Sequence, residues 1–132
     1  MAGTVLHYLS PEEESALKRS IPWARLDRHV RDLVRKANTI AGLATVQSCA
    51  GHIRPNGEGF NVSDASLTFR CDQDIAHRVL FSDAALCGIS DVSVRYFDSG
   101  TFWLTVTVDP ADLGKLDDLV NLLRTQKKTT SL

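Results

Sequence analysis

The sequence lacks the features that mark membrane, secreted and disulfide-stabilised proteins. Its 132 residues contain no apolar run long enough to span a bilayer, and Met1 to Val5 lack the basic and then apolar pattern of a signal peptide. Its three cysteines, an odd number at wide spacing, argue against a disulfide framework and suit a reducing compartment. We therefore expect a cytoplasmic protein with no membrane partner.

An excess of charge is also missing. Fifteen basic and 16 acidic residues leave a formal net charge of −1, so bulk charge offers no general attraction to nucleic acid. The glycine patterns of nucleotide-binding loops are absent, because Gly57-Glu58-Gly59 lacks the third glycine and the helix of a dinucleotide-binding motif. Any anion site must therefore come from a local patch that the fold assembles.

The composition is that of one ordinary globular domain. An apolar fraction of 43% and a charged fraction of 23% are typical values, and a chain of this length can bury a core without disulfides. We expect a single domain over residues 1–132. Within it, residues 1–22 form an N-terminal arm with a short helix, residues 23–125 form the core and residues 126–132 form a frayed tail.

Four helices are predicted from caps and apolar spacing. Ser10-Pro11-Glu12-Glu13 is typical of a helix start with a capping box, and this short helix ends before Pro22. The other helices run from about Trp23 to Ala41, from Asp72 to Leu86 or Cys87, and from Asp109 to about Arg124. The third helix should turn these apolar side chains inward: Ile75, Val79, Leu80 and Leu86.

The second predicted helix also carries basic side chains, which lie mostly away from its apolar stripe: Arg25, Arg28, Arg31, Arg35 and Lys36. A solvated helix face is the usual meaning of such a pattern. Binding of an anion is the alternative.

Four strands are predicted from alternating apolar and polar residues: Leu43 to Ala50, Ala65 to Cys71, Asp91 to Phe97 and Phe102 to Val108. Residues 51–64 between the first two strands are expected to be an irregular loop. Because each strand has one strongly apolar face, we expect a two-layer α+β fold, a single mainly antiparallel four-stranded sheet with helices on one face, in the order ααββαββα. The helical crossover should make the second and third strands parallel.

The other face of the sheet should be open and carry polar and aromatic side chains: Thr68, Arg70, Arg95, Phe97, Trp103, Thr105 and Thr107. Such a face suits either self-association into a homo-oligomer or an anionic or stacking ligand. The spacing of its aromatic residues does not match the signature of RNA-recognition sheets.

Reactive side chains gather where the first strand ends, in Thr45-Val46-Gln47-Ser48-Cys49-Ala50-Gly51-His52, with Arg54 close behind. Functional residues concentrate where regular pairing stops, so this stretch is the candidate site. Each residue also has a purely structural interpretation: Cys49 as a packed core cysteine, Gly51 as a turn residue, and His52 and Arg54 as solvated side chains.

The same stretch resembles a known family. Asp27 to Asn38, followed by Thr45 to Ile53, is similar to the tRNA wybutosine-synthesising methyltransferases, in which a helix ending near an Asn leads into Thr-x-x-Ser-Cys-Ser-Gly-Arg-Ile. Leu67 to Ala76 resembles that family's next strand and helix, so that the resemblance covers about residues 23 to 123. It implies a compact relative that uses S-adenosylmethionine to methylate a modified guanine in phenylalanine tRNA.

The resemblance carries over to Ser48, Cys49, Gly51 and the residue after Gly51. Two positions differ, because Ala50 replaces a Ser of the family and His52 replaces an Arg. The second difference removes a group that can hold a carboxylate or phosphate through two parallel contacts.

Three hypotheses follow from these residues. In a methyltransferase, His52 would be the base and Cys49 a second catalytic candidate, while ligand-binding candidates are Thr45, Ser48, Gly51, Arg54, Arg70, Arg95 and Trp103. In a non-catalytic module, the same loop and its arginines would bind a nucleotide or another anion. A thiol or metal site at Cys49 and His52 is the third, but no second close ligand pair follows, so no metal is predicted.

Overall fold

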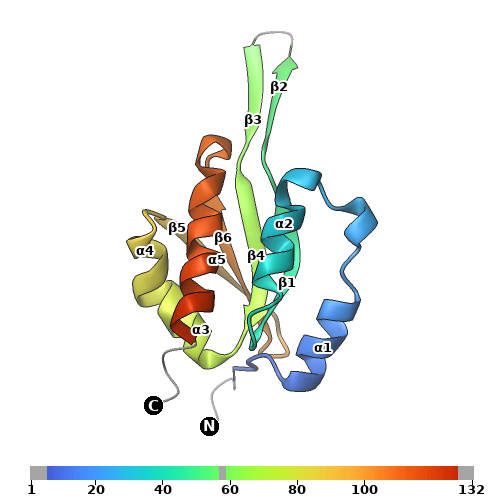
Figure 1. The fold of residues 1–132 in the computed structure, drawn as a ribbon, viewed down its shortest axis with the longest axis vertical. Coiled ribbons are helices and arrows are strands. Elements are labelled where there is room, and N and C mark those ends of the chain that lie inside the picture. Colours follow the sequence, from blue (N-terminus) through green and yellow to red (C-terminus); the bar gives the residue numbers. More distant parts are fainter. Residues whose placement is uncertain (1–5, 57–58, 128–132) are drawn as a thin grey trace.

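The structure, a computed structural model, has two layers: an antiparallel sheet and a layer of helices on one of its faces (Figure 1). It describes residues 6–56 and 59–127, and of residues 52–56, 59–63, 126 and 127 it describes the backbone alone. The sheet strands are β1 (Leu43–Cys49), β4 (Ala65–Cys71), β5 (Asp91–Tyr96) and β6 (Phe102–Val108). The predicted α+β class and order of elements are confirmed.

The order of strands across the sheet is β1-β4-β6-β5. Every neighbouring pair is antiparallel, so β4 and β5, which both pair with β6, run in the same direction, as predicted. The two edges of the sheet are therefore β1 and β5.

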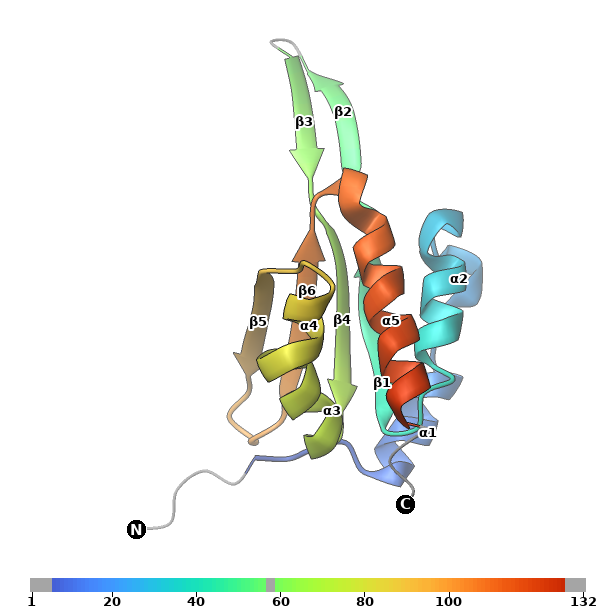
Figure 2. The same ribbon diagram turned by 60° about the vertical axis from the view of Figure 1, so that its left-hand side comes forward.

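The helices that cover the sheet are α2 (Arg28–Ala37), α5 (Leu113–Lys127) and a continuous stretch of α3 (Gln73–Arg78), η2 (Val79–Asp83) and α4 (Ala84–Leu86) (Figure 2). The interface between the two layers is the core. Its largest fully buried side chains are Val30, Val34, Leu43, Leu67, Phe69, Ile75, Val79, Leu104, Val106, Leu116, Leu119 and Leu123. No helix in the described part of the chain is long and apolar enough to cross a membrane.

The N-terminal helix α1 (Pro11–Arg19) begins as predicted, with a capping box between Ser10 and Glu13. The predicted helix from Trp23 to Ala41 is wrong, because it is two elements: a 3₁₀ turn, η1 (Trp23–Arg25), and then α2. Leu26 between them is extended, and the carboxylate of Asp27 accepts a hydrogen bond of 2.9 Å from the His29 backbone, which starts a new helix.

The third predicted helix is continuous but irregular. It consists of α3 (Gln73–Arg78), a π turn, η2 (Val79–Asp83), and α4 (Ala84–Leu86), with Asp72 as its cap. The wider π turn changes which side chains face inward. The prediction that Leu80 and Leu86 are buried is therefore wrong, since they are 41% and 71% exposed, whereas Asp83 is buried against Arg78.

The predicted irregular loop at residues 51–64 is also wrong, because most of it is a hairpin of β2 (His52–Asn56) and β3 (Gly59–Ser63). The hairpin projects beyond the end of the sheet, where β1 leads into β2 and β3 leads into β4 (Figures 1 and 2). The end of the sheet's β1–β4 pair is therefore the root of a two-stranded ribbon.

The last helical region begins with a 3₁₀ turn, η3 (Pro110–Asp112), and continues as α5. The predicted start at Asp109 is confirmed, and the helix extends beyond the predicted end at Arg124. Of the predicted frayed tail, residues 128–132 lie outside the described residues.

Candidate functional site

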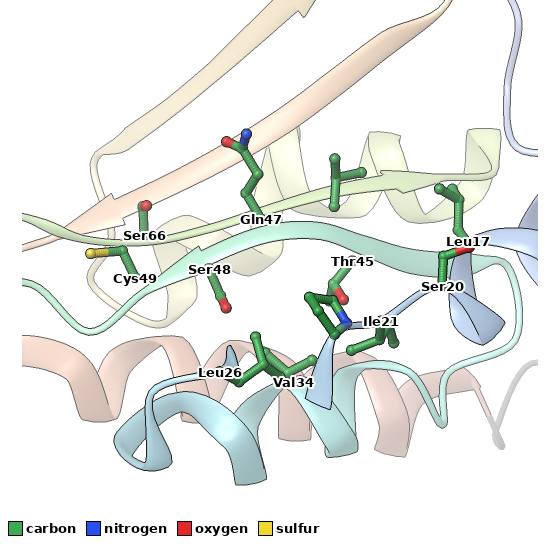
Figure 3. A pocket seen from close by; sticks show the side chains of 12 residues that line it. Leu17, Ser20, Ile21, Leu26, Val34, Thr45, Gln47, Ser48, Cys49 and Ser66 are labelled. Carbon is green, nitrogen blue, oxygen red and sulfur yellow. The ribbon is translucent and has the colours of Figure 1, made fainter. Parts of the chain in front are cut away.

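A cleft of about 420 Å³ lies between β1 and the segment that links α1 to α2 (Figure 3). Its lining residues are Leu17, Ser20, Ile21, Pro22, Leu26, Val34, Thr45, Val46, Gln47, Ser48, Cys49 and Ser66. None of these residues is charged: they are aliphatic residues, serines and a threonine, one glutamine and one cysteine. The candidate stretch of the sequence thus forms one wall of a cleft.

A bulge in β1 determines which side chains face each side of this wall. The pairing between β1 and β4 shifts between Thr45 and Gln47, so that Val46 is the additional residue. As a result Thr45 and Ser48 both point toward Leu26 and Val34, although they are three positions apart (Figure 3). The side chains of Gln47 and Cys49 lie on the other side of the strand.

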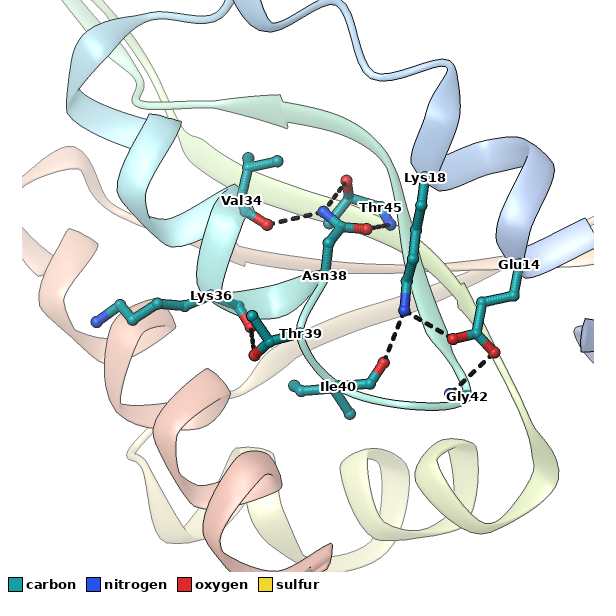
Figure 4. A network of polar contacts seen from close by, with 9 residues as sticks. All are labelled: Glu14, Lys18, Val34, Lys36, Asn38, Thr39, Ile40, Gly42 and Thr45. Atoms are coloured by element: carbon teal, nitrogen blue, oxygen red, sulfur yellow. Dashed lines mark hydrogen bonds and ion pairs between the residues drawn. The ribbon is translucent and has the colours of Figure 1, made fainter.

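Asn38, at the end of α2, fixes the middle of this wall (Figure 4). Its side-chain nitrogen donates hydrogen bonds to the Thr45 hydroxyl (2.9 Å) and to the Val34 carbonyl (2.7 Å). Its side-chain oxygen accepts from the Thr45 backbone N–H (3.2 Å). Thr45, predicted to bind a ligand, therefore lines the cleft with its hydroxyl already held by the protein.

Helix α1 clamps the turn that leads into β1 (Figure 4). The carboxylate of Glu14 accepts a hydrogen bond from the Gly42 backbone N–H (3.1 Å) and forms an ion pair with Lys18 (2.7 Å). Lys18 also donates a hydrogen bond to the Ile40 carbonyl (3.0 Å). Gly42 has a φ of 88°, a conformation that favours glycine. These contacts anchor the second wall of the cleft to the strand that forms the first.

The Ser-Cys-x-Gly stretch ends the strand at one end of the cleft. The backbone N–H of Gly51 donates to the Cys49 sulfur over 3.4 Å, and Gly51 has a φ of 79°. His52 and Arg54 follow in β2, but their side chains lie outside the described residues. Among the described side chains, no group of three His, Cys, Asp or Glu residues is placed to hold a metal ion.

Arg70 and Thr68 lie on the predicted face of the sheet, where the Thr68 hydroxyl bonds that of Thr105 (2.8 Å). The prediction that this face is open is wrong for both, since they are 6% and 4% exposed. The Arg70 guanidinium donates to the Glu13 carboxylate (2.5 Å) and to the His7 carbonyl (3.2 Å). The hydrogen bond from Arg70 lowers the pKa of Glu13 below its ordinary value. In the structure Arg70 ties the N-terminal arm to β4.

Arg95 and Trp103 lie on the sheet face that carries no helix layer, away from the cleft lining. The Arg95 guanidinium lies over two aromatic rings, 5.4 Å from the centroid of Phe97 and 6.0 Å from that of Trp103. The two rings meet edge to face at 4.9 Å. Of the predicted binding residues, Thr45 and Ser48 therefore line the cleft, Arg95 and Trp103 form a separate cluster, and Arg70 belongs to neither.

Sequence analysis missed the second wall of the cleft and a hollow next to it. The hollow, of about 370 Å³, is lined by Trp23, Arg28, Arg31, Asp32 and Arg35. The feature of the sequence that corresponds to this hollow is Arg28, Arg31 and Arg35 at helical spacing, a few residues after Trp23. The arginines alone are consistent with a solvated face or an anion site, and the hollow depends on the broken helix that places Trp23 beside α2.

Comparison of the chain with models of protein families, with curated proteins and with solved structures finds no match.

Proposed function

We propose that the protein is a methyltransferase that binds S-adenosylmethionine in the cleft beside β1 and acts on a base of a nucleotide or of tRNA. One observation carries this proposal: Ser48 and Cys49, from the motif that resembles the wybutosine-synthesising enzymes, lie in the wall of the cleft of about 420 Å³ beside β1. The motif and the cleft were identified independently, one from residue order and the other from geometry.

The chemistry of the cleft suits this cofactor better than a nucleotide phosphate. A volume of about 420 Å³ lies within the range of small-molecule sites. Adenosine has no charge and the sulfonium is a cation, so neither needs a basic partner. The single carboxylate of the cofactor carries less charge than a phosphate and can accept hydrogen bonds from the hydroxyls and backbone N–H groups of the lining. The aliphatic side chains of Leu17, Ile21 and Leu26 offer a surface for an adenine ring.

The roles of this chain's residues follow from their places. In the proposal Ser48 donates a hydrogen bond to the cofactor, and the outward-facing backbone groups of β1 bind the edge of its adenine ring. S-adenosylmethionine supplies a methyl group whose bond to sulfur breaks as its bond to a base nitrogen forms. In the proposal His52, which starts the strand after Gly51, accepts the proton that the nitrogen loses, because imidazole is the side chain most often used as a general base.

The basic hollow supplies a place for the phosphates of the substrate. Pro22 lines the cleft and Trp23 lines the hollow, so the two sites adjoin along the chain. Arg28, Arg31 and Arg35 outnumber the one acidic residue there, Asp32, and an aromatic ring beside arginines is a usual combination for bases and phosphates. This division places the cofactor and the anionic substrate in separate sites.

Calorimetry with S-adenosylmethionine and S-adenosylhomocysteine tests the binding step. We expect both to bind the wild-type protein, and Leu26→Trp, which fills the cleft, to abolish binding. Ser48→Val should weaken it, while Ser15→Val, an equal change on the exposed face of α1, should leave it unchanged. Absence of binding to the folded wild-type protein would refute the proposal.

A non-catalytic binding module is the second candidate. The observation that favours it is that no carboxylate, imidazole or basic side chain lines the described cleft, which leaves Cys49 in the lining and His52 beyond it as candidates for proton transfer. Methyl transfer from labelled S-adenosylmethionine to tRNA and to nucleotides separates the two functions. A methyltransferase should lose transfer but keep cofactor binding in His52→Ala. Binding of nucleotides that survives His52→Ala, is lost in Arg54→Ala and is accompanied by no transfer would favour the module.

A further inference from the structure

The strand β5 forms the edge of the sheet opposite the cleft and pairs only with β6 among the described strands. Its residues are largely exposed. Val92-Ser93-Val94 has the same order of residues in both directions, and the opposite charges of Asp91 and Arg95 flank it. An exposed edge strand offers a row of backbone donors and acceptors to another strand. The sequence of this strand is complementary to itself when it is reversed.

The hydrogen bonds at the turn between β5 and β6 show which backbone groups of β5 face outward. The Phe97 N–H donates to the Thr101 carbonyl over 2.9 Å, in register with the pairing of Arg95 with Trp103. In an antiparallel pair, hydrogen-bonded residues alternate with residues whose N–H and C=O point away. Arg95 is therefore bonded to β6, and the backbone groups of Val92 and Val94 point outward.

We propose that β5 pairs antiparallel with β5 of a second copy, about a twofold axis at Ser93, to make an eight-stranded sheet. In this register Val92 exchanges backbone hydrogen bonds with Val94 of the partner subunit, through the groups that point outward. A shift by one residue is excluded, because it would set an outward group against one that is bonded to β6.

The charges select this register from the others that the backbone allows. With the axis at Ser93, Asp91 lies opposite Arg95 of the partner subunit, and the symmetry makes this ion pair twice. Placing the axis at Val92 or at Val94 leaves both charges without an opposite charge across the strand. These pairs fall at non-hydrogen-bonded positions, where side chains are closest. Stacking on Phe97 and Trp103 already orients the Arg95 guanidinium.

Exposed apolar side chains concentrate on the same side of the molecule. Of the six large hydrophobic side chains exposed among the described residues, four belong to β5 or to the helix that precedes it: Leu80, Phe81, Leu86 and Tyr96. Phe81 is 79% exposed, and that helix lies beside β5 in both views (Figures 1 and 2). A second copy would cover part of this surface as it extends the sheet.

Charge reversal tests the pairing in the full-length chain by sedimentation equilibrium. We expect the wild-type protein to dimerise, and Asp91→Arg and Arg95→Asp each to raise the dimer dissociation constant at least about tenfold, since each change acts twice. Glu12→Arg, a reversal on α1, should have no effect. A wild-type protein that stays monomeric at about 100 μM, where a micromolar dimer would be nearly complete, would overturn the proposal.

Mixing the two single variants separates pairing from misfolding. Each variant repels itself, but a subunit with Asp91→Arg and one with Arg95→Asp have opposite charges at both facing positions. The mixture should therefore form heterodimers, and the double variant should regain homodimers. A dimer that both single variants form as well as wild type would place the contact elsewhere, including the open sheet face. The inference does not depend on the proposed function.

Discussion

Each edge strand of the sheet has backbone donors and acceptors that no neighbouring strand of the sheet binds, and the two edges differ in what faces them. The β1 edge is faced by the segment that links α1 to α2, which Glu14 and Lys18 clamp in place, and the space left between them is the cleft. The β5 edge carries exposed residues whose charges complement a second copy of themselves. A covered edge provides an interior site, whereas a bare edge provides a surface for assembly.

The largest change in folding stability should come from breaking the β1 side at Asn38. Asn38→Ala removes three hydrogen bonds and leaves the buried Thr45 backbone N–H without its acceptor, so we expect a loss of about 2 kcal/mol in the free energy of unfolding. Thr39→Ala, at an exposed neighbour whose hydroxyl bonds only the Lys36 carbonyl, should cost below about 0.5 kcal/mol. Urea denaturation measures both, and equal losses would contradict the role of Asn38.

A smaller effect is expected where the N-terminal arm joins the sheet. Glu13→Gln leaves the buried Arg70 without its charged partner, and because Glu13 is partly exposed we expect a cost of only about 1 kcal/mol. The pKa of Glu13 is lowered in the folded state, so its contribution is complete above the unfolded value, near 4.3, and is lost as the pH falls through the folded value.

Urea denaturation at pH 7 and in the acid range therefore tests whether Glu13 stabilises the fold through its ion pair with Arg70 or through packing alone. The difference in stability between wild type and Glu13→Gln should shrink as the pH falls below about 4. Arg70→Met, which removes the charge but keeps an unbranched side chain, should flatten the same part of the profile. A difference that stays constant down to pH 2 would show that Glu13 does not act through its charge.

The smallest effect concerns the thiol just before β5. Burial raises the pKa of Cys87, and the carboxylates of Asp118 and Asp83 raise it further, so little thiolate is present at neutral pH. Asp118→Asn should lower this pKa and speed labelling of Cys87 by about twofold at pH 8. Asp117→Asn, an equal change at the next residue, is the control. The rates can be followed by mass spectrometry of the labelled peptide.

The strands were predictable from sequence because the signals that specify them are local. Alternation along Ala65 to Cys71 and along Phe102 to Val108 predicted both central strands with their observed bounds, and the Ser10 capping box predicted the start of α1. The hairpin was missed because Pro55 and the glycines around it are typical of loops, while its pairing depends on the opposing strand.

The site was predictable only in part, for the same reason. The stretch around Ser48 and Cys49 was identified from its residue types, but the opposite wall at Ile21 and Leu26 exists only once α1 folds back onto β1. Arg70 pairs with Glu13, 57 positions away, and no local pattern indicates such a contact. The π turn similarly depends on an internal ion pair between Arg78 and Asp83 that period-based patterns do not anticipate.

The projecting hairpin gives the molecule a mechanical property. Each of its strands is five residues long, so the hairpin is about 16 Å long. Only Ala50 and Gly51 separate its first strand from β1. A force applied near the end of the hairpin produces a torque at its root. The root consists of the end of β1 at Cys49 and, through Asp64, the start of β4 at Ala65, so a torque on the hairpin acts on strands whose ends line the cleft at Cys49 and Ser66.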